Sequence, residues 1–371
     1  MILLPQTGSA IAEDWNYMKQ TGRSNINKRA AALLIGVIML TTMCGTMLNS
    51  CVKEPETEVY MITPNATSLM ECYIIKTKAG KLIVIDGGYV GLEREKDPYI
   101  KAALRAVAGK KKGELVEVEA WFLSHAHNDH INELARVMRE YVESDKIKIN
   151  NFYFDFPPYN TSEFPYKDGD YEDYLALKEA FTNYANVWGI EVPEGTTYFD
   201  MLNGQYVNGR TISKGQDIII DELRFEMLQT WDYTDMSDVN SSSLVFRMHV
   251  GDKTVLFLND LGPRGGQRLL KKYGDKLKSD YVHMAHHGQN GVTEEVYQAI
   301  DADVHLWGTT LNVWTNTEKY NTGKTRMWVN GGVDFDTADE HNIVTCLYEA
   351  YPSDPTSIKA WKKVLPVMRI I

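Results

Sequence analysis

The stretch that decides the fold is His125-Ala126-His127-Asn128-Asp129-His130, which holds three imidazoles and one carboxylate within six residues. His125 and His127 are two residues apart, and side chains two apart on extended backbone point the same way. Asp129 and His130 follow where a helix is expected to begin, so they turn toward a second position nearby. Imidazole and carboxylate groups are the usual ligands of zinc-like ions. The spacing therefore predicts a site for two metal ions.

The segments around this motif alternate between strand-like and helix-like patterns. A strand is expected at 119–124, directly before the motif, and a helix at 131–143, directly after it, where apolar residues recur at helical spacing. The other expected strands are 59–63, 71–77, 82–86, 151–156, two within 211–228, 244–250, 254–259, 281–285 and 303–307. The other expected helices are 98–108, 171–188, 267–273 and 294–300. This order fits an α/β fold in which two sheets pack face to face with helices outside.

Three further groups of polar residues each follow an expected strand. They are Asp86-Gly87-Gly88, Leu258-Asn259-Asp260 and Ala285-His286-His287-Gly288. Because the motif at His125 also follows a strand, all four groups can meet at one edge of the sheets. A catalytic metal site needs several such ligands and one position left open for water.

In this order the four groups resemble the metallo-β-lactamase superfamily, whose signature is H-x-H-x-D-H, over residues 57–310. The resemblance implies a four-layer αββα sandwich of two mixed β-sheets. It also implies that Asp86 supports the metal ligands without itself binding the metal. The implied cofactor is Zn2+, one or two ions per chain, with Mn2+ or Fe2+ as alternatives. The implied metal ligands are His125, His127, Asp129, His130, Asp260 and His286.

The sequence departs from the superfamily pattern at two places. Many members carry a further ligand histidine before the bridging aspartate, but here only His249 stands there, in an expected hairpin strand where a structural role is favoured. The place of the missing ligand holds Asp238-Val239-Asn240-Ser241-Ser242-Ser243, and the usual glycine before Asp260 is Asn259. The first metal position therefore lacks one expected ligand, whereas the second is complete.

The pattern D-x-N-x-x-S followed by Ala-His-His-Gly resembles the subgroup containing the hydrolase domain of competence-type DNA-uptake proteins, and phosphorylcholine esterases share a similar double histidine. Both kinds of relative act on phosphodiesters. The resemblance implies metal-assisted hydrolysis in which Asp129 or Asp260 accepts a proton from water. Whichever of His286 and His287 is not a ligand would donate to a substrate oxygen; His286 is taken as the ligand and His287 as the donor. Asn240 and Ser243 are candidate neutral donors, or alternatively they cap the turn before the next strand.

The expected function is an exported metal-dependent hydrolase that acts on a small-molecule or cell-envelope phosphodiester or phosphoester. Two alternatives stay open: a lactone, thioester or amide hydrolase on the same fold, and a non-catalytic surface binding protein that kept the fold. A formal net charge of −11 argues against long nucleic acid as substrate, because gripping its phosphate backbone needs clustered positive charge.

Residues 1–51 are interpreted as an export signal. Four basic residues between 19 and 29 precede an apolar run at 30–48, which ends in Leu48-Asn49-Ser50-Cys51 and so resembles the lipobox of bacterial lipoproteins. A lipid on Cys51 would anchor the protein to a membrane, in the periplasm or at the cell surface. An uncleaved anchor and a buried helix are the alternatives. Residues 52–57 would form a tether, and 58–371 the hydrolase domain, with Cys72 and Cys346 as buried thiols.

Overall fold

The structure is a computed structural model that describes residues 55–62, 71–89, 99–144, 146–157, 168–203, 215–232, 238–348, 359 and 367–370. The chain divides into two compact units, Met1–Pro55 and Glu56–Ile371. The predicted export signal, with its lipid anchor at Cys51, and the first part of the predicted tether lie outside the described residues. The last residue of that tether, Thr57, already belongs to the first strand of the second unit.

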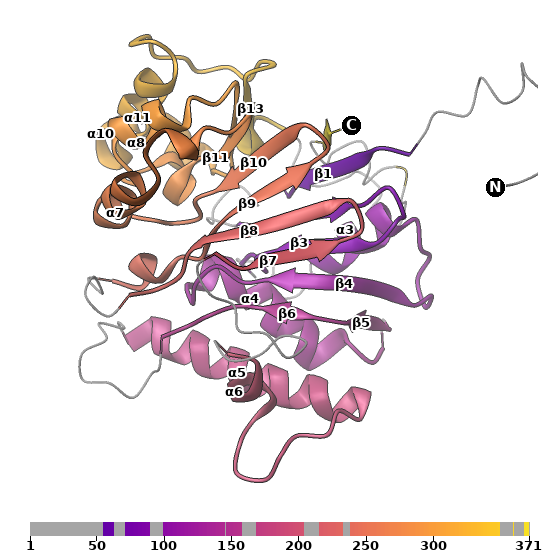
Figure 1. The fold of residues 1–371 in the computed structure, drawn as a ribbon. Helices are drawn as coiled ribbons and strands as arrows, with labels where there is room; N and C mark the ends of the chain where they lie inside the picture. Colours follow the sequence, from indigo (N-terminus) through magenta and orange to yellow (C-terminus); the bar gives the residue numbers. More distant parts are fainter. Residues whose placement is uncertain are drawn as a thin grey trace, which may run out of the picture. The chain divides into compact units, whose positions relative to one another are not determined.

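One sheet of the second unit has seven strands in the order β14-β1-β2-β3-β4-β5, with β6 paired to β4 (Figure 1). The strands are β1 (Thr57–Met61), β2 (Tyr73–Lys76), β3 (Leu82–Ile85), β4 (Val116–Phe122), β5 (Ile147–Ile149), β6 (Phe152–Tyr153) and β14 (Val367–Ile370). Strands β3, β5 and β6 run parallel to β4, whereas β14, β1, β2 and β3 pair antiparallel with one another. The sheet is therefore mixed.

The other sheet also has seven strands, in the order β13-β12-β11-β10-β9-β8-β7. The strands are β7 (Asp217–Ile220), β8 (Leu223–Gln229), β9 (Val245–Val250), β10 (Lys253–Phe257), β11 (Tyr281–His283), β12 (Val304–Trp307) and β13 (Asn342–Val344). Strands β10 to β13 are parallel and β7 to β10 are antiparallel, so this sheet is mixed as well.

Helices cover the outer faces of both sheets. Those associated with the first sheet are α3 (Tyr99–Ala108), α4 (Asn128–Arg136) with the π-turn η1 (Val137–Tyr141) after it, α5 (Asp168–Trp188) and α6 (Tyr198–Leu202). Those associated with the second sheet are α7 (Pro263–Tyr273), α8 (Glu294–Ile300), α9 (Leu311–Thr315), α10 (Thr317–Tyr320) and α11 (Thr322–Val329). Single 3-10 turns are η3 (Val239–Ser242), η4 (Gly274–Leu277), η5 (Ala285–Gly288) and η6 (Thr345–Leu347).

Three apolar clusters hold these layers together, because side chains alternate between the two faces of each strand. On β2, Ile74 belongs to the cluster under helices α3 to α6, while Ile75 points into the cluster between the sheets. Phe122 of the first sheet stacks on Phe225 of the second, with ring centroids 4.8 Å apart. A third cluster joins the second sheet to α7, α8 and α9. The arrangement confirms the expected αββα sandwich of two mixed sheets.

Some element boundaries differ from the expected ones. Strand β4 begins at Val116, three residues before the expected start, and the exposed Glu117 lies between the buried Val116 and Val118 in the alternation of a strand. Strand β6 is only two residues long, since the chain beyond it leaves the sheet and packs Phe154 and Phe156 under the helices. Strands β5, β13 and β14 and helices α6 and α9 to α11 had no strong pattern in the sequence. These elements are short, or their residues are of mixed polarity.

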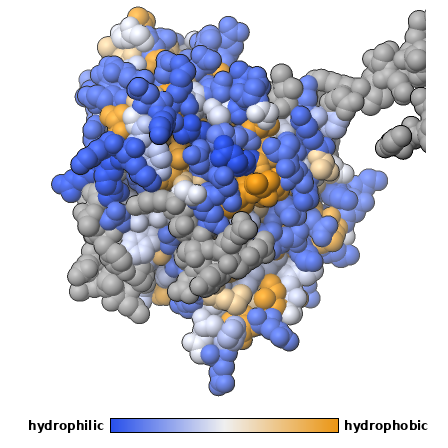
Figure 2. Space-filling model, viewed as in Figure 1, coloured by the Kyte–Doolittle hydropathy of each residue, from blue (hydrophilic) through white to orange (hydrophobic). Residues whose placement is uncertain are grey.

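The surface of the unit is mainly polar in the view of Figure 2, with apolar side chains gathered in small groups. Within the described ranges, no helix combines the length and apolar character that crossing a membrane requires. Cys72 is buried and Cys346 is half-buried, and both are free thiols.

Five strands end at the same edge of the sandwich. In the first sheet β3 and β4 run parallel, and in the second β10, β11 and β12 run parallel, so their carboxyl ends lie together. Each of these ends leads directly into one of the polar groups singled out in the sequence, or into Gly308 after β12. Both sheets therefore contribute side chains to one place.

Candidate metal centre

Asp86 lies at one side of the site, in the turn after β3. Its carboxylate accepts hydrogen bonds from the backbone N–H and the Oγ–H of Ser124, both at 2.7 Å, and lies 2.7 Å from Nδ1 of His130. The turn packs closely on α4, since a Cβ on Gly87 would lie 2.6 Å from Cβ of Leu134. Asp86 thus fixes the His130 ring with Nε2 pointing away from it, as the resemblance implied.

The histidine motif lies between β4 and α4. Nε2 of His125 and Nδ1 of His127 are 3.0 Å apart, so these two nitrogens converge. His127 precedes the first residue of α4, and its side chain does not cap the helix, which leaves the imidazole available. Asp129 and His130 belong to the first turn of α4 and point toward the end of β10.

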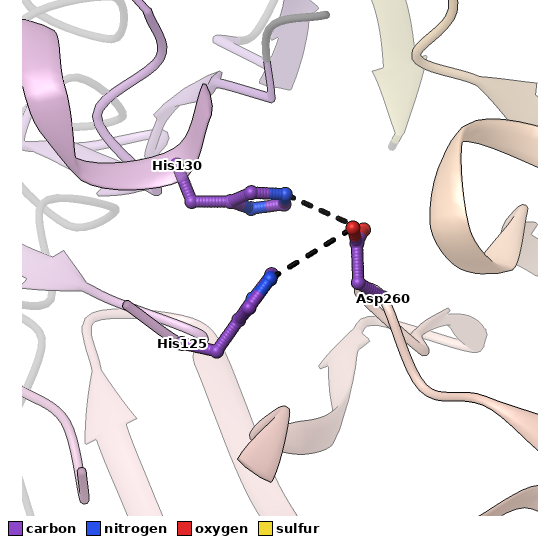
Figure 3. A group of neighbouring side chains, drawn as sticks. All are labelled: His125, His130 and Asp260. Carbon is purple, nitrogen blue, oxygen red and sulfur yellow. Dashed lines mark ion pairs between the residues drawn. The ribbon is translucent and has the colours of Figure 1, made fainter. Parts of the chain in front are cut away.

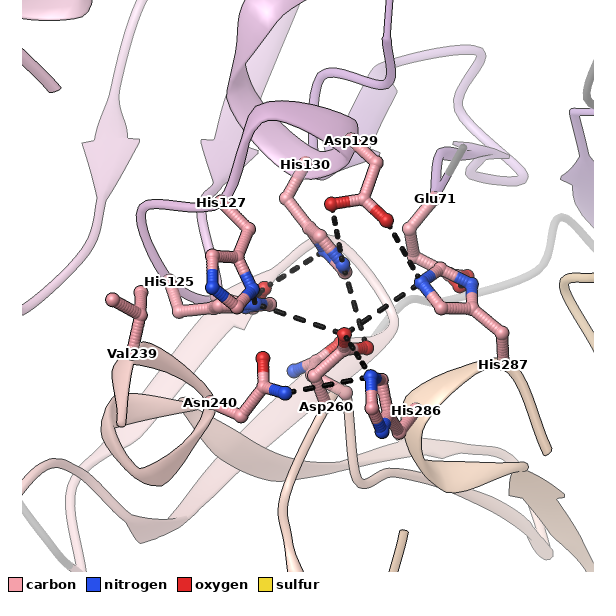
Figure 4. A network of polar contacts seen from close by, with 12 residues as sticks. Glu71, His125, His127, Asp129, His130, Val239, Asn240, Asp260, His286 and His287 are labelled. Carbon is pink, nitrogen blue, oxygen red and sulfur yellow. Dashed lines mark hydrogen bonds and ion pairs between the residues drawn. The ribbon is translucent and has the colours of Figure 1, made fainter. Parts of the chain in front are cut away.

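Asp260 is the centre of the arrangement, and its side chain is nearly inaccessible to solvent. Figure 3 shows its carboxylate facing His125 and His130, and Figure 4 adds two more imidazoles on its other side. The distances from its carboxylate oxygens are 3.4 Å to His130 Nε2, 3.6 Å to His287 Nε2, and 3.8 Å to Nε2 of both His125 and His286. A carboxylate among four imidazoles is a natural bridging ligand.

Asn259 explains how Asp260 reaches this position. Its φ is 48°, in the left-handed region that glycine and, next to it, asparagine tolerate best. The departure from the usual glycine is therefore compatible with the same backbone turn. The side-chain amide of Asn259 also donates to the carbonyl of Leu244, which ties the turn to the start of β9.

The two adjacent histidines after β11 point in different directions. His286 and His287 both have left-handed backbone, with φ of 52° and 57°. His287 is fully buried and its Nε2 lies 3.1 Å from Oδ2 of Asp129. His286 keeps 26 % of its side chain exposed and lies 3.4 Å from the amide of Asn240. The structure thus brings His287 to Asp129 and His130, and places His286, which was taken as the ligand, beside Asn240.

Two groups of side chains can be distinguished around Asp260. The inner cluster consists of Asp129, His130 and His287, whose ligand atoms lie within 4.8 Å of one another. The outer cluster consists of His125, His127, Asn240 and His286, and opens to solvent at His127 and His286. Figure 4 shows Asp260 between the two.

The donor set fits a divalent metal ion. Nε2 of His130 and Oδ1 of Asp260 are buried, and neither has a hydrogen-bond partner among the described residues. Leaving buried polar atoms without partners is costly, and a cation between them would satisfy both. His125, His130 and Asp260 form a second set of ligand atoms within 4.8 Å. Zinc and iron, which superfamily proteins bind, both accept imidazole and carboxylate ligands.

The pKa values show how strongly these groups interact. Burial alone raises the pKa of Asp260, but the charges of His130, His287 and His286 outweigh it and lower that pKa well below its usual range. Burial, together with the charge of His130, lowers the pKa of His125 well below the ordinary value. His125 is therefore neutral, which is the form that binds metal. Protons and metal ions compete for such a site.

The turn that replaces the missing histidine is capped by Asp238, whose carboxylate accepts the backbone N–H of Ser241 at 2.9 Å. The side chain of Asn240 is thus not needed for capping, and it points at His286. Ser243 lies outside the cluster, and its backbone N–H donates to the carbonyl of Asn240. His249 lies in β9 beside Glu226, 3.0 Å away, as the structural interpretation expected.

Two residues of the site were not identified from the sequence. Ser124 is one, and its place directly before His125 could have drawn attention to it. The other is Glu71, whose buried carboxylate lies beside His287. A lone charged residue at the start of an apolar strand was the available signal.

A family model described as the metallo-beta-lactamase superfamily matches residues 71–304. No curated protein matches the chain. Among solved structures, the metallo-beta-lactamase fold protein YhfI from Bacillus subtilis is 12 % identical, with 68 % of this chain and 85 % of that chain covered and a TM-score of 0.37.

Two further solved structures have similar scores. CmlA, a diiron beta-hydroxylase from Streptomyces venezuelae, is 12 % identical, with 86 % of this chain and 55 % of that chain covered and a TM-score of 0.38. A diphosphatase of the PhnP family is 12 % identical, with 67 % and 85 % covered and a TM-score of 0.33. At these values none of the three carries an argument about substrate.

Proposed function

Because the chain belongs to the metallo-β-lactamase superfamily, whose members are mostly metal-dependent hydrolases, we propose that it hydrolyses phosphodiesters with the help of bound metal. One observation carries the proposal. Asp260 lies between the inner cluster, whose ligand atoms are within 4.8 Å of one another, and the outer cluster, which reaches solvent and presents neutral donors. Metal would be held at the inner cluster, with a second position at His125 and His127, and substrate would approach from the side that is open to solvent.

Asp129, His130, His287 and Asp260 would hold the metal, with His125 and His127 offering a second position. A bound divalent ion lowers the pKa of water from about 15.7 toward roughly 7 and polarises the bond under attack. The side chain of Asp129 is 13 % exposed, against 2 % for Asp260. Asp129 is therefore the better placed of the two carboxylates to accept a proton from an attacking water.

The outer cluster suits the charge of a phosphodiester. Burial lowers the pKa of His286, which keeps its imidazole neutral. Neutral His286 and the amide of Asn240 can donate hydrogen bonds to a non-bridging oxygen, where negative charge grows in the transition state. His287 is too deeply buried to reach substrate, so the donor role first assigned to it passes to His286.

The test is metal analysis combined with hydrolysis of bis-p-nitrophenyl phosphate. We expect the purified protein to contain bound zinc or iron and to release p-nitrophenol, and Asp260→Ala to lose both properties. His249→Ala is the matched control, because this histidine lies in β9 away from the site. Bound metal without this activity would favour the lactone, thioester and amide substrates. A wild-type protein that binds no metal would favour a binding protein.

We also propose that the enzyme is exported and anchored through a lipid on Cys51, with small-molecule or envelope phosphodiesters as substrates. The support is the order of basic residues, apolar run and Leu48-Asn49-Ser50-Cys51 in the sequence. Labelling of expressing cells with radioactive palmitate should mark the wild-type protein in the membrane fraction. Cys51→Ala should lose the label, while Cys44→Ala, in the same segment, should keep it. A label that persists in Cys51→Ala contradicts the anchor.

A further inference from the structure

A buried carboxylate outside the two clusters lies behind His287. Glu71 stands two residues before β2 and is 1 % exposed. Its Oε2 lies 3.3 Å from Nδ1 of His287, and its Oε1 lies 3.2 Å from Nε2 of His283 in β11. Figure 4 shows Glu71 on the side of the His287 ring that faces away from Asp260. A carboxylate at this depth needs partners, because burying an isolated charge is costly.

The hydrogen on His287 can be placed from its neighbours. Nδ1 lies 2.7 Å from the carbonyl oxygen of Gly308, and a carbonyl only accepts, so Nδ1 carries the hydrogen. Nε2 is then the ligand atom, and it faces the carboxylates of Asp129 and Asp260 at 3.1 and 3.6 Å. A carboxylate beside the N–H of a ligand histidine fixes its tautomer and ring orientation and raises its basicity.

His283 is held in a defined orientation as well. The backbone N–H of Asn259 donates to its Nδ1 at 3.1 Å, so Nε2 carries the hydrogen on the side of Glu71. The ring meets Tyr73 edge to face, with centroids 5.7 Å apart, and is fully buried. His283 therefore connects Glu71 to the turn at Asn259 that carries the bridging carboxylate.

The backbone of Glu71 contacts the inner cluster a second time. Its N–H donates to the carbonyl of Asp129 at 2.9 Å, and its own carbonyl accepts the N–H of Gly88 at 3.0 Å. A Cβ at Gly308 would lie 2.7 Å from Oε2 of Glu71, so only glycine leaves room for the carboxylate there. One residue thus contacts two of the three inner ligands, Asp129 through its backbone and His287 through its side chain.

We propose that Glu71 and His283 form a positioning pair for the metal centre. The Gly308 carbonyl accepts the Nδ1–H of His287, and the Glu71 carboxylate, 3.3 Å from the same nitrogen, places its negative charge behind the ring, while His283 lies 3.2 Å from the other carboxylate oxygen. The inference rests on the metal site of the proposed function and is independent of its substrate. Metal affinity therefore depends on two residues that do not contact the ion.

The test is the affinity of the full-length protein for Zn2+, measured by competition with a chromogenic chelator, together with the Tm of the metal-free protein. Glu71→Gln keeps the side-chain shape but removes the negative charge that lies beside the ring nitrogens of His283 and His287. We expect its Zn2+ affinity to fall about 10–100-fold. Asp280→Asn is the matched control, since it removes a carboxylate that accepts hydrogen bonds from Thr254 at the opposite end of β11. Its Zn2+ affinity should equal that of the wild type.

A second variant and a second measurement guard against misfolding. His283→Phe keeps an aromatic ring in the core and removes both nitrogens, and it should weaken Zn2+ binding less than Glu71→Gln does. Wild-type affinity in either folded variant overturns the proposal. In zinc-loaded wild-type protein, nitrogen-15 NMR should find the His287 hydrogen on Nδ1, and a hydrogen on Nε2 overturns it. If the variants bind zinc more weakly and the wild-type protein does not hydrolyse phosphodiesters, the positioning pair is supported and only the proposed substrate is wrong.

Discussion

The inner and outer clusters share Asp260 but differ in how firmly the protein holds them. In the inner cluster the second ring nitrogen of each histidine has a partner at 2.7 Å, Asp86 for His130 and the Gly308 carbonyl for His287. In the outer cluster His125 is held by Ser124 Oγ at 2.9 Å, but the partly exposed His127 and His286 have longer contacts with the residues around the cluster. Nε2 of His127 lies 3.8 Å from Asp170, its nearest carboxylate partner among the described residues, and His286 lies 3.4 Å from Asn240.

This difference separates the side chains that would bind metal from the side chains that a substrate can reach. Fixing a ligand before the metal arrives lowers the entropy cost of binding, so the inner cluster is where affinity is built. A substrate must displace water and find side chains that can adjust, and these are present in the outer cluster, where His127 and His286 remain about one-quarter exposed. Three pairs of variants test this division, and a fourth pair tests the backbone that carries the shared Asp260.

The largest effect should come from the two adjacent histidines. His287→Ala removes an inner ligand and should weaken Zn2+ binding more than about 100-fold, beyond the usual cost of losing a supporting residue. His286→Ala should keep its metal and lose activity instead. Metal titration and hydrolysis rates of both variants give the answer. Equal metal loss in both would break the distinction between the clusters.

The next effect concerns the support of the inner cluster. Asp86→Asn weakens the contact with Nδ1 of His130 while keeping the side-chain shape, and should lower Zn2+ affinity about 10–100-fold. Asp170→Asn is the corresponding change beside His127, and it should alter affinity much less. Competition with a chelator measures both, and a larger loss in Asp170→Asn would reverse the comparison.

A smaller effect is expected at the open side. Asn240→Ala removes one hydrogen-bond donor and should lower kcat/KM about tenfold, which corresponds to one hydrogen bond of ordinary strength. Its metal content should remain that of the wild type. Ser243→Ala, in the same turn but outside the cluster, serves as the control. Loss of metal from Asn240→Ala would place this residue among the ligands.

The smallest effect concerns the backbone that carries Asp260. Asn259→Ala puts an ordinary side chain at φ 48° and should lower the free energy of unfolding by about 1–2 kcal/mol. Asn259→Gly accepts this φ without strain and loses only the side-chain hydrogen bond to Leu244. Both variants lack this hydrogen bond, so chemical denaturation of the two isolates the backbone strain, and a glycine variant no more stable than the alanine variant would contradict it.

The sequence was sufficient for the fold and for most of the site. The motif at His125, the turn at Asp86 and the strand end at Asp260 could be placed together because each follows a strand, and parallel strands end at one edge. Which of His286 and His287 faces Asp129 and His130 could not be predicted. It depends on two successive left-handed residues, which no side-chain pattern announces for histidine.

Glu71 escaped prediction for a different reason. Its partners, His283 and His287, are more than 200 positions away in the sequence, and they meet it only because the two sheets pack face to face. Reading each strand by itself gives the direction of a side chain but not what lies opposite. Contacts between sheets therefore had to come from the structure.

Asp129 and His130 belong to the first sheet's side of the sandwich, whereas Asp260 and His287 follow strands of the second. An ion bound by all four residues would cross-link the two halves of the domain. Ligands that bind only the folded state stabilise it by mass action, by about 2.7 kcal/mol at a concentration 100 times the Kd. Resistance to heat and proteolysis would then rise and fall with the metal supply of the surroundings.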